Sequence, residues 1–191
     1  MAGKKPPVTG GSQAPAGGPP DRIWIVGGPG CGKSTLAAHL AKARGLTCVS
    51  LDTHFWGPAW TPVPEADFVA GVGAELRGER WVVDGQFPAA VDAYAGTSDC
   101  LIWVDPPLHV AWPRLLRRTL RRWIRREELY GGTRETLWTV IGPRSILWYA
   151  LKVRTPQRRA NEALFTRLTG TGIRLIRFRG TDVRSLVGRI T

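Results

Sequence analysis

The sequence predicts an α/β fold, a three-layer α/β/α sandwich with a mostly parallel five-stranded sheet. Two observations lead to this prediction. Five short apolar runs alternate along the chain with segments of helical periodicity. The first of these runs, Arg22–Val26, is apolar on both faces, as expected in the middle of a parallel sheet that helices cover. Right-handed crossovers would then connect the strands.

Length and composition fit a single domain. The chain has 191 residues, of which 43% are hydrophobic, which is enough material for a buried core. Residues 1–20 are mainly Gly, Pro, Ala, Ser and Lys and contain no aromatic residue. Such a segment cannot bury enough apolar surface to offset the entropy of ordering. We therefore expect a disordered tail over residues 1–20 and one domain over residues 21–191.

Charge and cysteine content restrict the partners and the compartment. The net charge of +12 favours anionic partners, which could be nucleotides, nucleic acid or a membrane surface. The cysteines, Cys31, Cys48 and Cys100, lie far apart without CxxC spacing, so we expect neither a disulfide framework nor a zinc site. No apolar run is long enough to cross a bilayer, and the N-terminus lacks the apolar core of a signal peptide. We expect a cytoplasmic protein with no membrane association.

The segment after the first strand has the pattern of a phosphate-binding loop. It reads Gly27, Gly28, Pro29, Gly30, Cys31, Gly32, Lys33, Ser34 and Thr35, and a helical pattern follows. Glycines allow the loop to bend and leave its N–H groups open to phosphate oxygens. Lys33 would neutralise the β and γ phosphates, and the Ser34 hydroxyl would ligate Mg²⁺. A glycine-rich turn without a ligand is the alternative, but it does not require the Lys-Ser pair.

The next two predicted elements bring a carboxylate to the same edge of the sheet. The helix after the loop should end at Gly45, a good C-terminal cap. A second strand, Thr47–Leu51, would deliver Asp52 to its carboxyl end, where open α/β sheets bind ligands. Asp52 would orient or deprotonate an acceptor hydroxyl. Its alternative role is that of a helix or turn cap.

Residues 53–76 are rich in aromatic side chains and contain no Lys or Arg. They include Phe55, Trp56, Trp60 and Phe68, and their second half has helical periodicity. A third strand, Arg80–Asp84, follows and is succeeded by Gly85. A carboxylate in this position could hold Mg²⁺ through water, although Asp-Gly is also an ordinary turn. Trp56 and Trp60 could equally pack in the core.

The fourth strand, Leu101–Val104, precedes a strongly basic helix. Proline removes an amide donor and clashes with the preceding turn, so Pro113 predicts regular helix mainly from Trp112 onward. We expect two or three of its arginines to contact phosphate and the rest to be solvated. The arginines on its polar face are Arg114, Arg117, Arg118, Arg121, Arg122, Arg125 and Arg126.

The last third of the chain predicts a lid or loop over residues 127–143 and then more helices. One helix should begin near Arg144, and a second at Thr155-Pro156, with the threonine as its cap. A fifth strand is expected at Arg174–Phe178, and Thr181 should cap a short final helix.

With the loop, Asp52, Asp84-Gly85 and the arginine helix in view, the chain resembles the adenylate-kinase-like group of P-loop nucleoside and small-molecule kinases. Within that group it is similar to the FlaR-like branch, the topology modulation proteins. The resemblance covers residues 22–126 well. It implies a P-loop NTPase fold and a role for Arg114 and Arg118 in stacking on adenine and contacting phosphates. It also implies, more weakly, that residues 179–181 contact the adenine ring.

One departure from the group indicates the acceptor. Kinases of nucleoside monophosphates need cations for the acceptor phosphate, often an arginine just after the Asp-Gly of the third strand. Here that stretch reads Gln86-Phe87-Pro88-Ala89. A buried phosphate dianion without a cation would cost several kcal/mol. The acceptor is therefore expected to be an uncharged small molecule with a hydroxyl group.

Together these patterns predict an ATP- and Mg²⁺-dependent phosphotransferase. Residues 27–35 would hold the triphosphate, and Lys33 and Arg118 would neutralise charge on the transferred group. Ser34 and Asp84 would position the metal. Asp52 would activate the acceptor. Two alternatives stay open: a nucleoside monophosphate kinase that recruits cations from elsewhere, and a nucleotide-gated nucleic-acid-binding protein. The sequence does not distinguish a monomer from a homodimer.

Overall fold

The sheet at the centre of the molecule has five strands. In the computed structural model, which describes residues 18–57, 61–125 and 146–190, every strand pair is parallel. The strand order is β2-β3-β1-β4-β5. The strands are β1 (Arg22–Val26), β2 (Thr47–Ser50), β3 (Trp81–Asp84), β4 (Cys100–Val104) and β5 (Arg174–Phe178). The predicted α/β class is thus confirmed, and within the described residues the sheet is parallel throughout.

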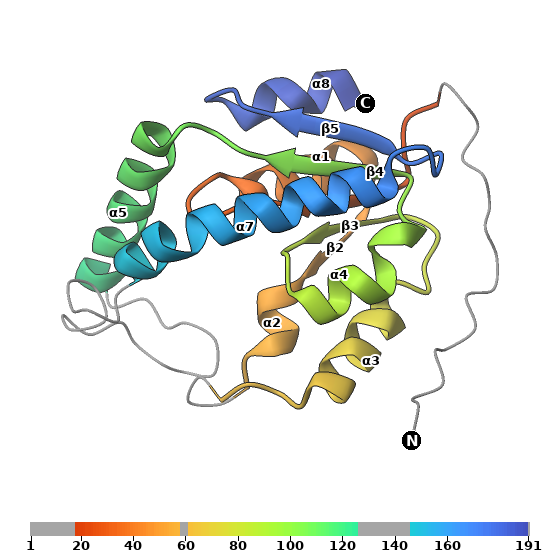
Figure 1. Cartoon of the computed structure of the whole chain (residues 1–191), viewed down its shortest axis with the longest axis horizontal. Coiled ribbons are helices and arrows are strands. Elements are labelled where there is room, and N and C mark those ends of the chain that lie inside the picture. Colours follow the sequence, from red (N-terminus) through yellow and green to blue (C-terminus); the bar gives the residue numbers. More distant parts are fainter. Residues whose placement is uncertain (1–17, 58–60, 126–145, 191) are drawn as a thin grey trace.

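Helices cover both faces of this sheet (Figure 1). The strands β4 and β5 point with their carboxyl ends toward α5, while α1 and α8 lie on one face and α4 and α7 on the other. The helical elements are α1 (Lys33–Arg44), α2 (Leu51–Phe55), α3 (Glu65–Glu75), α4 (Pro88–Tyr94), η2 (Ala95–Thr97), α5 (Leu108–Arg125), α7 (Ile146–Leu168), η4 (Val183–Leu186) and α8 (Val187–Ile190). This is the three-layer α/β/α arrangement that the sequence predicts.

Alternation along β1 explains the two layers of core. Successive side chains of a strand point to opposite faces of the sheet. Ile23 and Ile25 therefore pack with Leu36 and Leu40 of α1, whereas Trp24 joins the cluster on the α7 face. All five side chains are fully buried. Because both faces of β1 are covered, the loop that follows it starts from a fully buried strand end.

The predicted strand Thr47–Leu51 is one residue too long. The structure ends β2 at Ser50, and residues Leu51–Phe55 form the short helix α2. The Thr53 hydroxyl donates to the carbonyl of Ser50 at 2.6 Å, a local bond that favours a turn over further strand. Asp52 consequently lies in the first turn of a helix, where a negative charge is favourable.

The predicted delay of the helix at Pro113 and the predicted break before Pro156 are both wrong. Helix α5 begins at Leu108 and runs through Pro113, and α7 is one helix that contains Pro156, so Thr155 is not a cap. Each proline removes one backbone hydrogen bond. Around Pro113, burial of Ala111 and Leu115 against the core holds the helix continuous. Tertiary packing thus overrides the local preference that the sequence predicts.

The cap of the final helical segment is also one residue from its expected position. Asp182, not Thr181, caps η4, because its carboxylate accepts a hydrogen bond from the backbone N–H of Arg184 at 3.0 Å. This bond lowers the pKa of Asp182.

Several predictions lie wholly or partly outside the described residues: the tail over residues 1–20, of which only 18–20 are described, the positions of Trp60 and Arg126, the lid or loop at residues 127–143, and the helix start near Arg144. Among the helices that the structure describes, none combines the length and apolar composition that crossing a membrane requires.

Candidate active site

Three glycines of the phosphate-binding loop adopt the left-handed backbone that the sequence predicts for them. Gly27, Gly30 and Gly32 have φ angles of 148°, 72° and 99°. A Cβ atom on Gly27 would lie 2.3 Å from the carbonyl oxygen of Val104, and one on Gly30 would lie 2.5 Å from that of Ala111. Side chains are therefore excluded twice, by conformation and by space. The loop is pressed against the end of β4 and the start of α5.

The first turn of α1 is arranged to receive an anion. Gly32 occupies the N-cap position, no side chain caps the helix, and no acidic residue lies in its first turn. The first N–H groups and the helix dipole therefore remain available to an anionic ligand. The Lys33 ammonium donates to the carbonyl of Gly28 at 3.2 Å, so it lies over the loop, and Ser34 is exposed beside it.

Cys31, in the middle of the loop, adds no negative charge there. Its thiol is 2% exposed, and burial raises its pKa above the ordinary value. A thiol in this state is neutral at physiological pH, which suits a loop that binds phosphate.

Asp84 ends β3 directly beside the loop. The strand register pairs it with Ile25 of β1 and Ser50 of β2. The residue is 6% exposed, and its Oδ1 atom is buried without a hydrogen-bond partner. An unpartnered carboxylate oxygen is costly unless a cation or an ordered water satisfies it. This observation fits a divalent cation at Asp84.

The remaining ligands of such a cation would not come from a protein cage. Among the described residues, no group of three or more His, Cys, Asp or Glu side chains could hold a metal ion. Mg²⁺ commonly takes one or two carboxylates together with phosphate oxygens and water. Asp84 and the Ser34 hydroxyl, on neighbouring elements, match this pattern.

Asp52 lies within electrostatic reach of the same group. Loss of hydration is the largest effect on its carboxyl group and raises its pKa, and the charge of Asp84 raises it further. The cations of Lys33, Arg118 and Arg122 act in the opposite direction. The residue itself is exposed. An accessible carboxylate with a raised pKa thus lies within electrostatic reach of the loop lysine and of the second carboxylate.

Aromatic rings pack behind Asp52. The centroid of Phe55 lies 4.3 Å from that of Phe87, 4.8 Å from that of Trp56 and 5.5 Å from that of Phe68. Phe68 is 2% exposed, whereas the other three rings are half-buried. We call these four residues the aromatic cluster. Phe68 belongs to the buried core, and Phe55 and Phe87 pack against that core as partly buried side chains.

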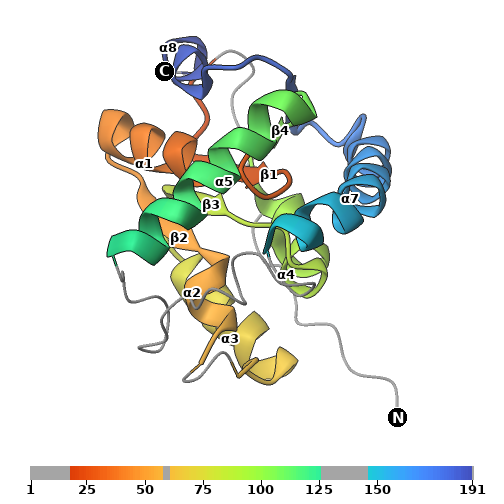
Figure 2. The ribbon, with the colours of Figure 1, turned by 90° about the vertical axis from the view of Figure 1, so that its left-hand side faces the viewer.

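Helix α5 crosses the carboxyl ends of the strands (Figure 2). Its arginines differ in exposure and in the groups that they contact or influence. Arg114 donates to the carbonyl of Thr181, in the loop after β5. Arg118 and Arg122 are half-buried and influence Asp52, whereas Arg117 is exposed. The face therefore divides into residues toward the loop after β5, residues toward Asp52 and residues in solvent.

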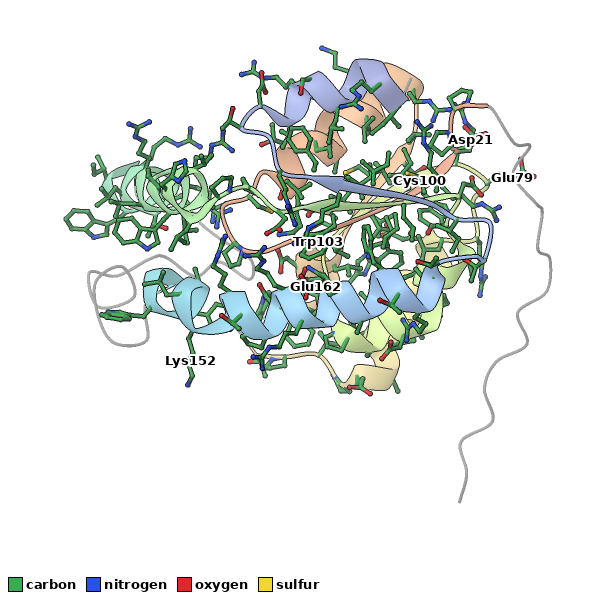
Figure 3. The ribbon with its side chains drawn as sticks, turned by 45° about the horizontal axis from the view of Figure 1, so that its top comes forward. Asp21, Glu79, Cys100, Trp103, Lys152 and Glu162 are labelled. Atoms are coloured by element: carbon green, nitrogen blue, oxygen red, sulfur yellow. The ribbon has the colours of Figure 1, made fainter. Side chains whose placement is uncertain are left out.

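A cavity that the sequence did not indicate lies between the loop, the end of β4, α5 and α7. Asp105 at its wall is 8% exposed and pairs with Arg177 at 2.7 Å and with Arg158 at 3.2 Å. The Arg177 guanidinium also stacks 3.7 Å over the Trp103 ring, close to Glu162 of α7 (Figure 3). The cavity is lined by residues of all four elements, among them Gly28, Pro29, Trp112, Arg154, Gln157 and Asn161.

Two further residues escaped the sequence argument because neither belongs to a motif. The Gln86 carbonyl oxygen, Oε1, accepts hydrogen bonds from the Gly27 N–H at 2.7 Å and from Asn161 Nδ2 at 3.2 Å. In the sequence, Gln86 stood out only as a position without a cation. A polar residue directly after Asp84-Gly85 was the available signal.

Comparison with known proteins gives a structural likeness without a likeness in sequence. No family model and no curated protein matches the chain. A gluconokinase from Sinorhizobium meliloti 1021 superimposes with a TM-score of 0.52 at 17% identity, with 90% of each chain covered. A shikimate kinase from Acinetobacter baumannii, solved in complex with shikimate, gives a TM-score of 0.52 at 17% identity over 88% of this chain and 90% of that one. The chain therefore has the P-loop kinase fold that these two proteins share.

Proposed function

We propose that the protein is an ATP- and Mg²⁺-dependent phosphotransferase that acts on a hydroxyl group of a small molecule. The observation that carries the proposal is the meeting of Lys33, Asp84 and Asp52 at one edge of the sheet. A loop for phosphate alone would serve a switch or a motor equally well. A second, accessible carboxylate with a raised pKa is what a kinase needs to hold or accept the proton of an acceptor hydroxyl.

Each residue has a definable task in this reaction. The amides of residues 27–35 and the Lys33 ammonium would bind the phosphates, and Arg118 would neutralise charge that develops on the transferred group. Arg114, beside Thr181, would contact the nucleotide. Mg²⁺, held by Ser34 and Asp84, would supply charge stabilisation between the phosphates. Asp52 would orient the acceptor hydroxyl and receive its proton.

The acceptor proposed first is uncharged. The aromatic cluster and the absence of Lys and Arg from residues 53–76 support a surface that recognises a neutral molecule. One observation favours the alternative of an anionic acceptor, such as a nucleoside monophosphate. Arg118 and Arg122 reach the neighbourhood of Asp52 from α5, so the acceptor side receives positive charge from a distant part of the chain.

Release of ADP in the presence of a panel of sugars, alcohols, hydroxy acids and nucleoside monophosphates tests these possibilities together. Stimulation by a neutral hydroxyl compound supports the first acceptor class, and stimulation by a monophosphate or a hydroxy acid supports the anionic class. ADP release that no acceptor increases indicates a plain NTPase and overturns the proposal.

Substitutions at the loop and at Asp52 separate binding from chemistry. Lys33→Ala is expected to lower phosphoryl transfer by about a thousandfold or more, whereas Lys42→Ala, at an exposed lysine in the last turn of the same helix, should leave it unchanged. Asp52→Asn should abolish turnover and leave ATP binding nearly intact. Loss of ATP binding in Asp52→Asn would reassign this residue to the metal.

Several finer statements belong to the same proposal. Membership of the FlaR-like branch rests on the motifs in residues 22–126, and a cytoplasmic location fits the three free cysteines. A nucleic-acid-binding role would show itself as steeply salt-dependent binding of a random duplex.

A further inference from the structure

Gln86 connects three parts of the molecule through a single oxygen atom. It follows β3 directly after Asp84-Gly85 and is half-buried. Its Oε1 atom accepts the backbone N–H of Gly27 at 2.7 Å and the Asn161 amide at 3.2 Å. The first residue of the phosphate-binding loop and helix α7 are therefore joined across the end of β3.

Both donors are held where an alternative acceptor would be difficult to find. Gly27 is buried at the end of β1 and has a left-handed backbone. Asn161 is 4% exposed. A buried donor that loses its acceptor pays its desolvation cost, so each group constrains the position of the others.

The same part of α7 reaches the loop a second time. A Cβ atom on Gly28 would lie 3.4 Å from Gln157 Oε1, so this carboxamide borders the loop one residue beyond Gly27. One residue further, Arg158 pairs with Asp105 at the end of β4. One turn earlier, Arg154 donates to the carbonyl of Pro106 at 3.4 Å. Arg154 and Arg158 of α7 thus contact the segment after β4 from the same turn that borders the loop.

We propose that Gln86 and Asn161 are positioning residues of the phosphotransfer reaction, and that the shared Gln86 oxygen holds Gly27 and the cavity-lining turn of α7 in one register. The inference rests on the proposed function, because it takes residues 27–35 as the loop that binds the phosphates. The competing explanation is a hydrogen bond that only adds stability. That explanation predicts a lower melting temperature without a change at a distant element.

Four variants distinguish the two explanations. Gln86→Met keeps the length of the side chain and removes the acceptor, and Asn161→Leu removes the donor on α7. Gln86→Glu keeps an acceptor but places a negative charge beside the loop. Arg167→Met is the matched control, because Arg167 anchors α7 to Asp92 of α4 at 2.8 Å, away from the loop.

Hydrogen exchange in the ligand-free protein is the first measurement. Positioning predicts that Asn161→Leu increases exchange in the peptide spanning residues 27–35, and that Gln86→Met increases it there and in the peptide spanning residues 154–161. Gln86→Glu and the Arg167→Met control should retain wild-type exchange in the loop. Unchanged loop exchange in both Gln86→Met and Asn161→Leu would overturn the proposal.

Kinetics are the second measurement. Gln86→Met should lower kcat about tenfold, the order of effect that follows from one lost buried acceptor, and Gln86→Glu should instead raise the KM for ATP while kcat falls less. The double variant Gln86→Met/Asn161→Leu should be no slower than Gln86→Met alone, because the two residues act as one unit. Fully multiplicative effects on kcat would overturn the coupling. If Gln86→Met does not fold, Asn161→Leu and Gln86→Glu decide the same question.

The two proposals fail separately. A wild-type protein that transfers no phosphoryl group would overturn the proposed function, and the exchange measurement would still decide whether the loop and α7 are coupled.

Discussion

The candidate site has a phosphate side and an acceptor side, and the backbone shapes one while side chains shape the other. On the phosphate side, the shape comes from the backbone: Gly27 and Gly30 lie against the carbonyl oxygens of Val104 and Ala111. On the acceptor side, the shape comes from side chains: rings of the aromatic cluster pack behind Asp52, on a helix of five residues. The backbone leaves no room for an added atom at Gly27 and Gly30, whereas a wall of side chains can change one residue at a time. Substrate identity is therefore expected to reside in the acceptor half.

Gly27→Ala tests the intolerance of the phosphate half and should have the largest effect. The new methyl group would meet the Val104 carbonyl at 2.3 Å in a left-handed backbone conformation. We expect the free energy of unfolding to fall by more than about 3 kcal/mol, measured by urea denaturation. Gly28→Ala is the control, because its φ is not positive and its nearest neighbour would be at 3.4 Å. Equal urea midpoints for Gly27→Ala and Gly28→Ala would contradict the view that close backbone contacts define the shape of the loop.

Phe68→Ala tests whether the halves are independent. Phe68 is 2% exposed and contacts the rings of Phe55 and Phe87, so its removal should lower the free energy of unfolding by about 3 kcal/mol. The KM for the acceptor should rise, whereas the Kd for ATP should stay within about twofold of the wild-type value. Phe68→Leu, which retains most of the volume, should show a smaller loss. A weaker affinity of Phe68→Ala for ATP would mean that the two sides of the site are not independent.

Asp52→Asn should stabilise the protein while it abolishes turnover. A carboxyl group with a raised pKa binds more protons in the folded state than in the unfolded state between its two pKa values. Stability therefore falls as pH rises through that window, and at neutral pH the charged Asp52 is a cost. The variant should gain no more than about 1 kcal/mol at pH 7, because solvent screens an exposed group. Thermal melts should show this gain in stability at pH 7. Below pH 3.8, the ordinary pKa of an aspartate, the gain should disappear.

Arg122→Gln should produce the smallest effect. The Arg122 guanidinium lowers the pKa of Asp52. Removing this charge should therefore shift the acidic limb of the plot of kcat against pH to higher pH by a fraction of a pH unit. Arg117→Gln, at an exposed position on the same helix, should leave that limb in place. A shift of equal size in both variants would mean that only the net charge of α5 matters.

The sequence could predict the phosphate half because short-range stereochemistry determines it. The three glycines at positions 27, 30 and 32 do adopt backbone angles that other residues avoid, whereas the phosphate-binding role of the loop stays a prediction. Helix continuity through Pro113 and Pro156 could not be predicted in this way. The local penalty of a proline is visible in the sequence, whereas the packing that outweighs it is contributed by distant residues.

Long-range partners explain the other omissions. Gln86 and Asn161 meet only when β3 and α7 are folded, and neither has a motif around it. The acceptor pocket was predicted to lack cations from residues 53–76 and 86–89 alone. Arg118 and Arg122 act on Asp52 from α5, a distant part of the chain. A single sequence gives the spacing of residues along the chain but not which distant residues meet in the folded protein.

The close approach of Gly27 and Gly30 to β4 and α5 has a consequence for how the protein is made. The loop motif is synthesised early, but its fit depends on Val104 and Ala111, and Gly32 lies against Val183 near the end of the chain. A nascent chain that has emerged only as far as β3 carries the whole motif and none of the surface that shapes it. Such a chain should not retain ATP, so nucleotide affinity during synthesis would report the arrival of the second half of the sheet.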